Sequence, residues 1–332
     1  ASRDSVLRSK QRLAAARPVE NFVNMSERHE DSKRKMRWRD ALAATLREAV
    51  PGSVITNYRL GVLLWKLVEA RAYGGRPLAL PNSPIGRTMF TQAKAAAIDR
   101  QVLREDPQLP PSVFRVLGSK DADVSELLCQ VDPFGHIAYL SAMAQHGLTN
   151  RLPRVLYFRT LDPASWTRAA QERMAVDLGD DLQRYLQAAL PTLRHSKVEK
   201  LDGQTIEIVR SKDAGTGWRH MGENGLRVST IGRTFLDMLQ RPDLCGGIRH
   251  VIEIFEVYAE GYLGLILREI SAHGSKIDQA RAGFILEDRC NIKDPTLDEW
   301  AKSAIRGGSR KLDPHTEYFS TFSERWCLSI NV

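Results

Sequence analysis

Apolar residues recur three and four positions apart in the first third of the chain, which is the spacing of one buried helix face. Pro51-Gly52 and Pro107 stand where the first and third apolar stripes stop, since proline cannot continue a helix. Thr56 or Asn57 can cap the second helix. We therefore predict three helices and, after them, one strand. The helices cover residues 41–49, 57–68 and 88–105, and the strand covers residues 113–117.

The stretch between the second and third predicted helices is rich in residues that break regular structure. Residues 74–86 contain three prolines and three glycines. This composition predicts a long loop, more than the tight turn of a simple helix-turn-helix. Three helices followed by a strand that can serve as a wing are typical of a winged helix, a DNA-binding fold.

The rest of the chain mixes short extended runs with helical stripes. In the segment Val131–Arg159, Asp132-Pro133 starts a turn, a helix fits residues 137–145, and Gly147 suits a left-handed helix cap before a buried strand. Residues 163–190 carry a long helical stripe that Gly179 breaks or bends. This mixture of elements predicts an α+β fold class. Strands are expected at 155–158, 205–209, 226–229 and 326–332, and helices at 230–240, 247–260, 261–273 and 275–289.

The charge of the chain is uneven. Of 332 residues, 48 are Lys or Arg and 40 are Asp or Glu, a formal net charge of +8. Residues 1–119 hold 21 basic and 11 acidic side chains, whereas residues 120–332 hold the other 27 and 29. A positive field concentrated in one third favours phosphate binding, although a plain solubility surface is an alternative. We predict a basic N-terminal arm (1–36), a winged-helix DNA-binding domain (37–119) and a C-terminal domain (120–332).

The third predicted helix has the side chains that a recognition helix needs. Such a helix offers donors and acceptors to base edges and long cations to phosphates. The alternative is an ordinary solvated helix face. The residues expected to face a DNA groove are Thr91, Gln92, Lys94, Arg100 and Gln101, and those expected to contact phosphates are Arg104 and Arg115.

No catalytic signature stands out. The sequence has no Walker loop, no GxSxG and no HExxH, so we expect no enzyme activity, no metal and no cofactor. His136 and His146 lie ten positions apart and are more simply explained as surface or hydrogen-bonded histidines than as metal ligands. The four cysteines form no CxxC pair, which predicts reduced thiols. No apolar run approaches the roughly 20 residues of a membrane span, and the N-terminus is too charged for a signal peptide, so a cytoplasmic protein is expected.

Two groups of charged residues beyond the third helix are candidates for a structural role or for contact with a partner. Arg233 and Asp237 are four positions apart on a predicted helix and are expected to form a structural ion pair or to contact a partner. Arg306, Arg310 and Lys311 belong to a glycine-containing basic loop. This loop suits a phosphate, an acidic partner surface or simple exposure to solvent.

Two blocks of sequence carry a resemblance to a known family. The first is DPFGHIAYLSAMAQHGLTNRLP, from Asp132, and the second is RVSTIGRTFLDMLQRPDLCGGI, from Arg227 to Ile248. Together they resemble the AbiEi family, which comprises antitoxins of type IV toxin–antitoxin systems that also regulate transcription. The resemblance covers roughly residues 40–332. The chain departs from the family at Ile231-Gly232, where Pro-Glu is usual, so an acidic role is not carried over to that position.

The resemblance implies a function in two parts. The winged helix would bind operator DNA that contains inverted repeats and would repress its own operon. The C-terminal domain would counter a cognate nucleotidyltransferase-like toxin, with or without direct contact. One alternative is a stand-alone repressor whose second domain serves dimerisation or effector sensing. A second alternative is an enzyme that processes nucleic acid and uses the basic domain for delivery.

Overall fold

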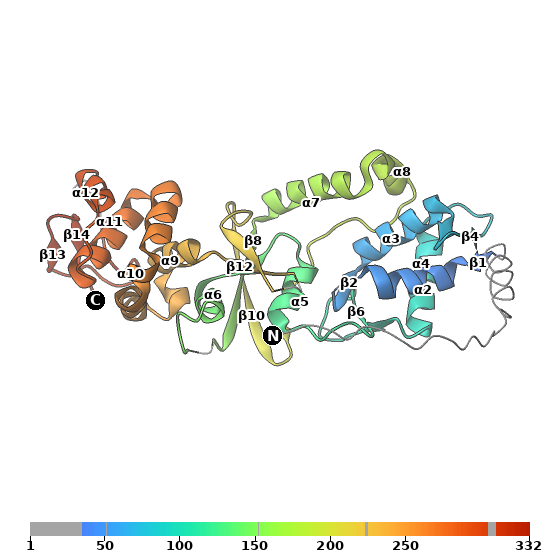
Figure 1. Cartoon of the computed structure of the whole chain (residues 1–332), viewed down its shortest axis with the longest axis horizontal. Coiled ribbons are helices and arrows are strands. Elements are labelled where there is room, and N and C mark those ends of the chain that lie inside the picture. The colour runs from blue at the N-terminus through green and yellow to red at the C-terminus, as the bar shows by residue number, and fades with distance from the viewer. Residues whose placement is uncertain (1–34, 51, 152, 223–224, 305–309) are drawn as a thin grey trace, which may run out of the picture.

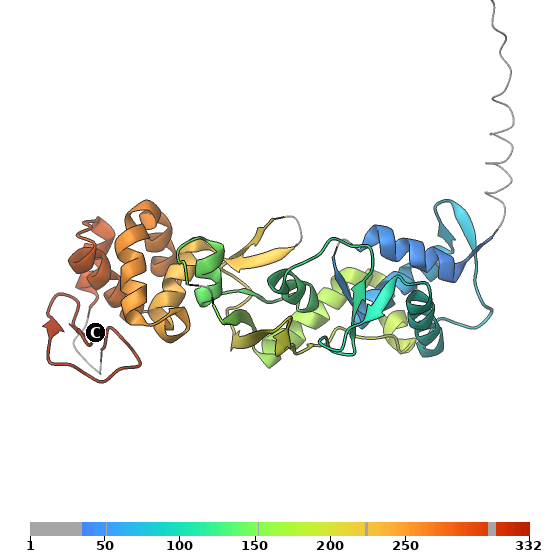
Figure 2. The ribbon, with the colours of Figure 1, turned by 90° about the horizontal axis from the view of Figure 1, so that it is seen from below.

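The computed structural model describes residues 35–332 except 51, 152, 223–224 and 305–309. The fold is a mixture of helices and strands, which confirms the predicted α+β class. Three parts follow one another along an elongated molecule: a helical part with small sheets, a central sheet, and a helical C-terminal part (Figure 1). Figure 2 shows the same order from a perpendicular direction.

The first part has the connectivity of a winged helix. Its three-stranded antiparallel sheet has the order β2-β6-β5, and the first two long helices precede and follow β2. The hydroxyl of Thr56 accepts a hydrogen bond from the backbone N–H of Arg59, so Thr56 is the cap of the second helix. The elements are α2 (Trp38–Ala49), β2 (Val54–Thr56), α3 (Asn57–Ala70), α4 (Arg87–Asp99), β5 (Leu103–Glu105) and β6 (Val113–Val116).

Two predictions for this part were wrong. The stretch predicted as a loop contains a hairpin, β3 (Ala72–Tyr73) and β4 (Arg76–Ala79), whose outer partner is β1 (Met36–Arg37). Gly74 and Gly75 make the hairpin turn with φ of 55° and 76°, which glycine adopts without strain. The third helix ends at Asp99 rather than near residue 105. Residues 103–105 instead hydrogen-bond to β6, because strand pairing with a distant segment outweighs their helical spacing.

The central sheet contains six strands in the order β11-β12-β7-β8-β10-β9. Strands β8 and β10 run parallel over seven paired residues, and the Asp202-Gly203 turn joins β9 to β10 as a hairpin. The elements are α5 (Val124–Val131), β7 (His136–Ile137), α6 (Tyr139–Gln145), β8 (Val155–Leu161), β9 (Lys200–Leu201), β10 (Gln204–Ser211), β11 (Trp218–Met221) and β12 (Leu226–Ser229).

A helical arm connects β8 to the later strands and reaches back to the winged helix (Figure 1). It consists of α7 (Pro163–Leu178), a short 3-10 turn at Gly179–Asp181, and α8 (Leu182–Gln187). Gly179 has a φ of 52°, so the long predicted helix is broken where the sequence placed the break. Met174, Leu178 and Tyr185 from this arm are buried in the apolar core of the winged helix.

The C-terminal part is built from helices. The two predicted helices at 247–260 and 261–273 are one helix of 26 residues, because Gly261 stays helical. The strand predicted over 326–332 shrinks to the two residues of β14. No helix among the described residues is long and apolar enough to cross a bilayer. The elements are α9 (Ile231–Gln240), a 3-10 turn (Pro242–Cys245), α10 (Ile248–His273), α11 (Lys276–Phe284), a π-helical turn (Ile285–Arg289), α12 (Pro295–Lys302), β13 (Phe322–Ser323) and β14 (Leu328–Ser329).

Apolar contacts cross the domain boundary predicted after residue 119. Val54, Leu109 and Val113 of the winged helix pack in one cluster with Leu127 and Phe158 of the central part. The side-chain amide oxygen of Gln130 also accepts a hydrogen bond from the backbone N–H of Val54. The winged helix and the central sheet are therefore joined by a shared core, not only by a linker.

Candidate nucleic-acid interface

Helix α4 presents one face to solvent and one to the core. Met89, Phe90, Ala93 and Ala97 are buried. The opposite face of its first three turns is exposed and carries small or polar side chains. A helix N-terminus also offers free backbone N–H groups and the positive end of the helix dipole, both of which favour phosphate. The exposed residues of this face are Arg87, Thr88, Thr91, Gln92, Ala95 and Asp99.

Two of the predicted groove-facing residues lie on this exposed face. Thr91 is exposed, and its hydroxyl donates to the carbonyl of Arg87 one turn earlier. Gln92 is exposed, and its side-chain oxygen accepts a hydrogen bond of 3.1 Å from Arg39 of α2. That bond leaves the amide N–H groups of Gln92 available as donors. Arg87 was not among the predicted residues, because the sequence placed the helix start one position later.

The other predicted residues of this helix are differently placed. Lys94 is half-buried, with its ammonium 5.5 Å from the centre of the Phe114 ring. Arg100 follows the last residue of α4 and donates twice to Asp40, at 2.7 and 3.1 Å. Gln101 is exposed and has a left-handed φ of 54° beyond the helix end. Arg100 therefore links the end of α4 to α2, where its charge is already paired.

The wing does not stand free in solvent. The side chain of Gln108 at its tip accepts a 2.8 Å hydrogen bond from the backbone N–H of Asp202 in the β9–β10 turn. Arg115 on β6 forms a 2.8 Å ion pair with Asp106 and lies 3.9 Å from Asp202. Arg104 on β5 is exposed. Of the two predicted phosphate contacts, Arg115 holds the wing against the sheet, and Arg104 remains open to solvent.

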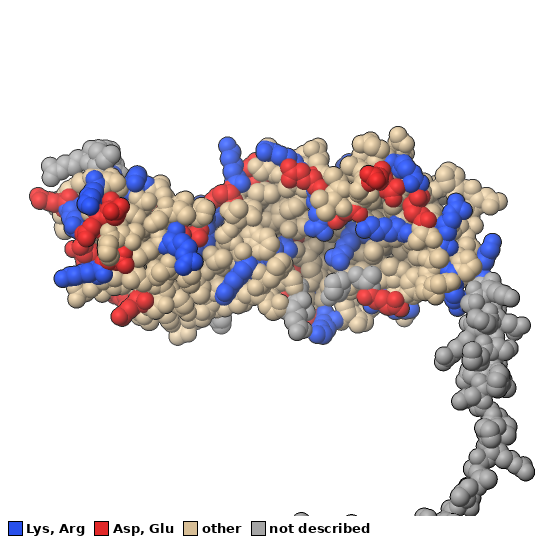
Figure 3. Space-filling view, turned by 45° about the horizontal axis from the view of Figure 1, so that its top comes forward, with Lys and Arg blue, Asp and Glu red and all other residues tan. Residues whose placement is uncertain are grey.

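The winged helix carries most of the positive surplus of the chain. Residues 35–119 contain 13 Lys or Arg and six Asp or Glu. Several of these acids are already engaged, since Asp40, Asp106 and Glu69 pair with arginines. On the face seen in Figure 3, basic side chains are spread along the molecule among acidic ones and do not form one continuous patch. A DNA contact would thus depend on α4 and the cations near it.

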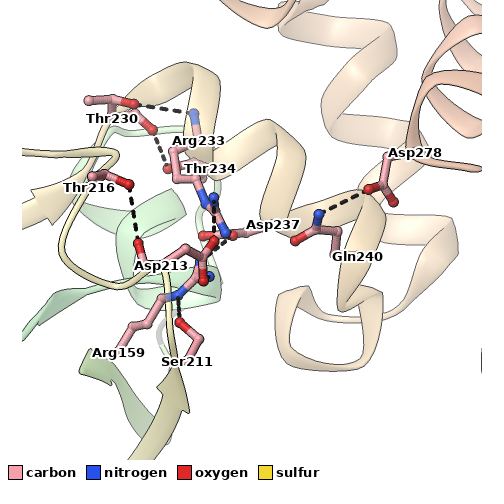
Figure 4. A network of polar contacts seen from close by, with 10 residues as sticks. All are labelled: Arg159, Ser211, Asp213, Thr216, Thr230, Arg233, Thr234, Asp237, Gln240 and Asp278. Carbon is pink, nitrogen blue, oxygen red and sulfur yellow. Dashed lines mark hydrogen bonds and ion pairs between the residues drawn. The ribbon is translucent and has the colours of Figure 1, made fainter. Parts of the chain in front are cut away.

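A buried ion cluster joins the central sheet to the C-terminal helices (Figure 4). Asp237 on α9 accepts hydrogen bonds of 2.8 Å from both Arg159 and Arg233. Asp213 accepts from the same two arginines, at 2.8 and 3.1 Å. Partial burial raises the pKa of Asp213, but the guanidinium groups of Arg159 and Arg233 outweigh it and hold this pKa at about 2. These four residues, called the buried ion cluster below, balance in charge.

His136 lies beside this cluster without taking part in it. Both of its ring nitrogens are buried and have no hydrogen-bond partner among the described residues. Burial and the neighbouring arginines lower its pKa to about 3, so the ring is neutral at ordinary pH. His146 is elsewhere, with its Nε2 2.6 Å from the carbonyl of Ser229. No group of three or more metal-ligating side chains occurs in the described part of the chain.

The two sequence blocks that carry the family resemblance contact each other. The Nε2 atom of His146 in the first block lies 2.6 Å from the carbonyl oxygen of Ser229 in the second, and Arg159, six residues after the first block, bonds to Asp237. The guanidinium of Arg227 donates to the carbonyls of Gly135 and Asp132, at 2.7 and 2.6 Å. The blocks thus form one interface between the sheet and α9.

The structure describes only part of the basic C-terminal loop. Arg306 lies outside the described residues. Arg310 donates to the carbonyl of Lys276, and Lys311 donates to the carbonyl of Thr316. Both side chains are half-buried and contribute to local packing.

Comparison with known proteins gives little further information. No protein-family model matches this chain, and no curated protein matches it. Among solved structures, the chain is similar to the crystal structure of the RV2827C protein from Mycobacterium tuberculosis, with a TM-score of 0.46 and 12% sequence identity. The match covers 89% of this chain and 92% of that one. A likeness this distant carries no argument about function.

Proposed function

We propose that this protein is a DNA-binding transcriptional regulator that inserts α4 into the major groove of its own operator. The observation that carries the proposal is the exposed polar N-terminal face of α4 within a winged-helix connectivity. Gln92 offers amide donors and Arg87 a long cation, which are side chains suited to base edges and phosphates. The positive surplus of the winged helix supports the same assignment.

Fluorescence anisotropy with a labelled duplex from the chain's own upstream region tests the proposal. Gln92→Ala and Arg87→Ala should each weaken operator binding by about 1–3 kcal/mol if the side chain reads a base. Arg249→Ala is the matched control, because Arg249 is an exposed arginine on α10, outside the winged helix. Unchanged affinity in both α4 variants would refute the placement of this helix in the groove.

The salt dependence of binding provides a second criterion. Six to ten phosphate contacts would lower the affinity by about 10³-fold or more between 50 and 200 mM salt. Arg104→Ala should weaken binding to operator and random DNA about equally, because a phosphate contact carries no sequence information. A flat salt response would count against an electrostatic interface.

A second proposal is that the protein acts as an AbiEi-type antitoxin and carries no catalytic function of its own. It is favoured by one observation: the two blocks that resemble this family contact each other, through Arg227 on the carbonyls of Gly135 and Asp132 and through His146 at the carbonyl of Ser229. Co-expression with the neighbouring toxin gene tests it. The wild type should relieve growth arrest, and Gln92→Ala should still do so if neutralisation does not depend on operator binding. Absence of rescue by the wild type would leave the stand-alone regulator as the function.

A further inference from the structure

A cavity of about 590 Å³ lies beneath the helical arm, between α7, α8 and the irregular segment that precedes β9. Its walls are mainly apolar. They include Trp166 and Met174 from α7, Leu186 from α8 and Leu193 from the following segment. Leu186 is 40% exposed, so part of this apolar wall faces solvent. A volume of this size is typical of a site for a small organic molecule.

The charged residues that line the cavity are both arginines, and its other polar lining residues are Thr167, Gln171, Thr192 and His195. Arg194 and Arg210 line it, and both side chains are exposed. His195 completes this side, with its ring 5.5 Å from the indole ring of Trp166 in an edge-on contact. No acidic side chain lines the cavity among the described residues. The carboxylate of Asp132 is buried and lies 3.7 Å from the Nε2 atom of His195.

Apolar walls with two uncompensated arginines at one side complement an amphipathic anion. A carboxylate or sulfonate accepts charge-assisted hydrogen bonds from guanidinium groups, and an apolar body gains by leaving water. We propose that this cavity binds a small organic anion with an apolar body, with its charged group at Arg194 and Arg210 and its body against Trp166 and Met174. None of the residues that line this cavity belongs to α4, but Arg194 also lines a neighbouring pocket that contains Arg87 of α4.

The cavity lies between the helical arm and the central sheet. One wall comes from the sheet through Arg210 on β10, and the other comes from the arm. The arm in turn is fastened to α3, because Tyr58 donates to Asp177 at 2.9 Å and Trp65 donates to Asp181 at 3.2 Å. A ligand in the cavity would therefore contact both the sheet and the arm that covers the winged helix.

Titration with anilinonaphthalene sulfonate, followed by its fluorescence, tests the site in the full-length protein. We expect saturable binding of one dye per chain, displacement by octanoate, and much weaker displacement by octan-1-ol, its neutral counterpart. Arg210→Gln should weaken dye and octanoate binding about tenfold, the effect of losing one charge-assisted hydrogen bond. Arg168→Gln is the control, because Arg168 is exposed on α7 but does not line the cavity.

A second variant keeps the test decisive. Leu186→Asp places a negative charge in an apolar wall at an already exposed position, so the fold should be retained and anion binding should fall by more than tenfold. Far-UV circular dichroism confirms that each variant is folded. The proposal is overturned if the wild type shows no saturable binding, if neither variant weakens binding, or if Arg168→Gln weakens it equally.

Discussion

Replacing Asp237 by alanine should be among the most damaging single changes in this protein. The carboxylate is 1% exposed and bonds to Arg159 and Arg233, whose side chains are 6% and 5% exposed. In its absence, the ion-pair partner that these two buried guanidinium groups would retain among the described residues is Asp213, which is 54% exposed. Removing one partner from a buried ion pair costs about 3–5 kcal/mol, because the remaining charge is left uncompensated.

Urea unfolding, followed by far-UV circular dichroism, measures this cost. The control is Asp243→Ala, which breaks an ion pair of 2.8 Å with Arg241 where the side chains are 34% and 43% exposed. A pair of that kind contributes about 0–1 kcal/mol. If Asp237→Ala lost no more stability than Asp243→Ala, the cluster would not hold the sheet to α9, and the reasoning would be refuted.

Three further changes have defined outcomes. The pKa of Asp213 is lowered from 3.8 to about 2, so the stability that its carboxylate contributes to the folded protein is present above pH 4 and lost as the pH falls through 2. The difference between the urea midpoints of the wild type and Asp213→Asn should therefore become smaller over that range. Asp40→Ala and Arg100→Ala should each lower the free energy of unfolding by up to about 1 kcal/mol and leave the preference for operator over random DNA unchanged. If Arg100→Ala alone lost that preference, Arg100 would contact a base, as its sequence position suggested. Gly283→Ala brings a methyl group to 2.1 Å from the ring of Trp326 and should lower the free energy of unfolding by about 1–3 kcal/mol, seen as a fall in melting temperature. Gly261→Ala is the control, because the space around Gly261 is open and its melting temperature should not fall.

Local chemistry made several elements predictable from the sequence. The i, i+4 stripe of the arm and its break at Gly179 appear as expected, because both depend on neighbouring residues only. The Asp202-Gly203 turn forms a hairpin, with both residues at positive φ, a conformation that the Asp-Gly pair favours. The cap at Thr56 is likewise a contact over three residues.

Elements that depend on distant partners were not predictable in the same way. Leu103 has helical spacing from the preceding apolar residues, yet it belongs to a strand because β6 offers hydrogen bonds. Gly261 reads as a break, but the long helix passes through it because both flanking segments pack in one core. In each case the deciding contact comes from outside the local window.

The same distinction applies to the candidate interface. The exposed positions of Thr91 and Gln92 follow from helical periodicity, which the sequence reveals directly. Arg100 and Arg115 have the same chemistry but are drawn to carboxylates that the sequence does not place beside them, Asp40 in one case and Asp106 in the other. A sequence shows which cations exist, but the fold decides which of them are already paired.

The joining of the winged helix to the rest of the chain determines how its functions can be separated. A fragment that begins at residue 120 would lack the winged-helix residues that pack against Tyr185 in one apolar cluster and against Leu127 in another. Either loss would expose apolar surface and favour aggregation of the C-terminal fragment. Point changes on the exposed face of α4, such as Gln92→Ala, leave both clusters untouched because that side chain lies outside them. The proposed DNA binding and the proposed antitoxin function are therefore better separated by substitutions on α4 than by cutting the chain.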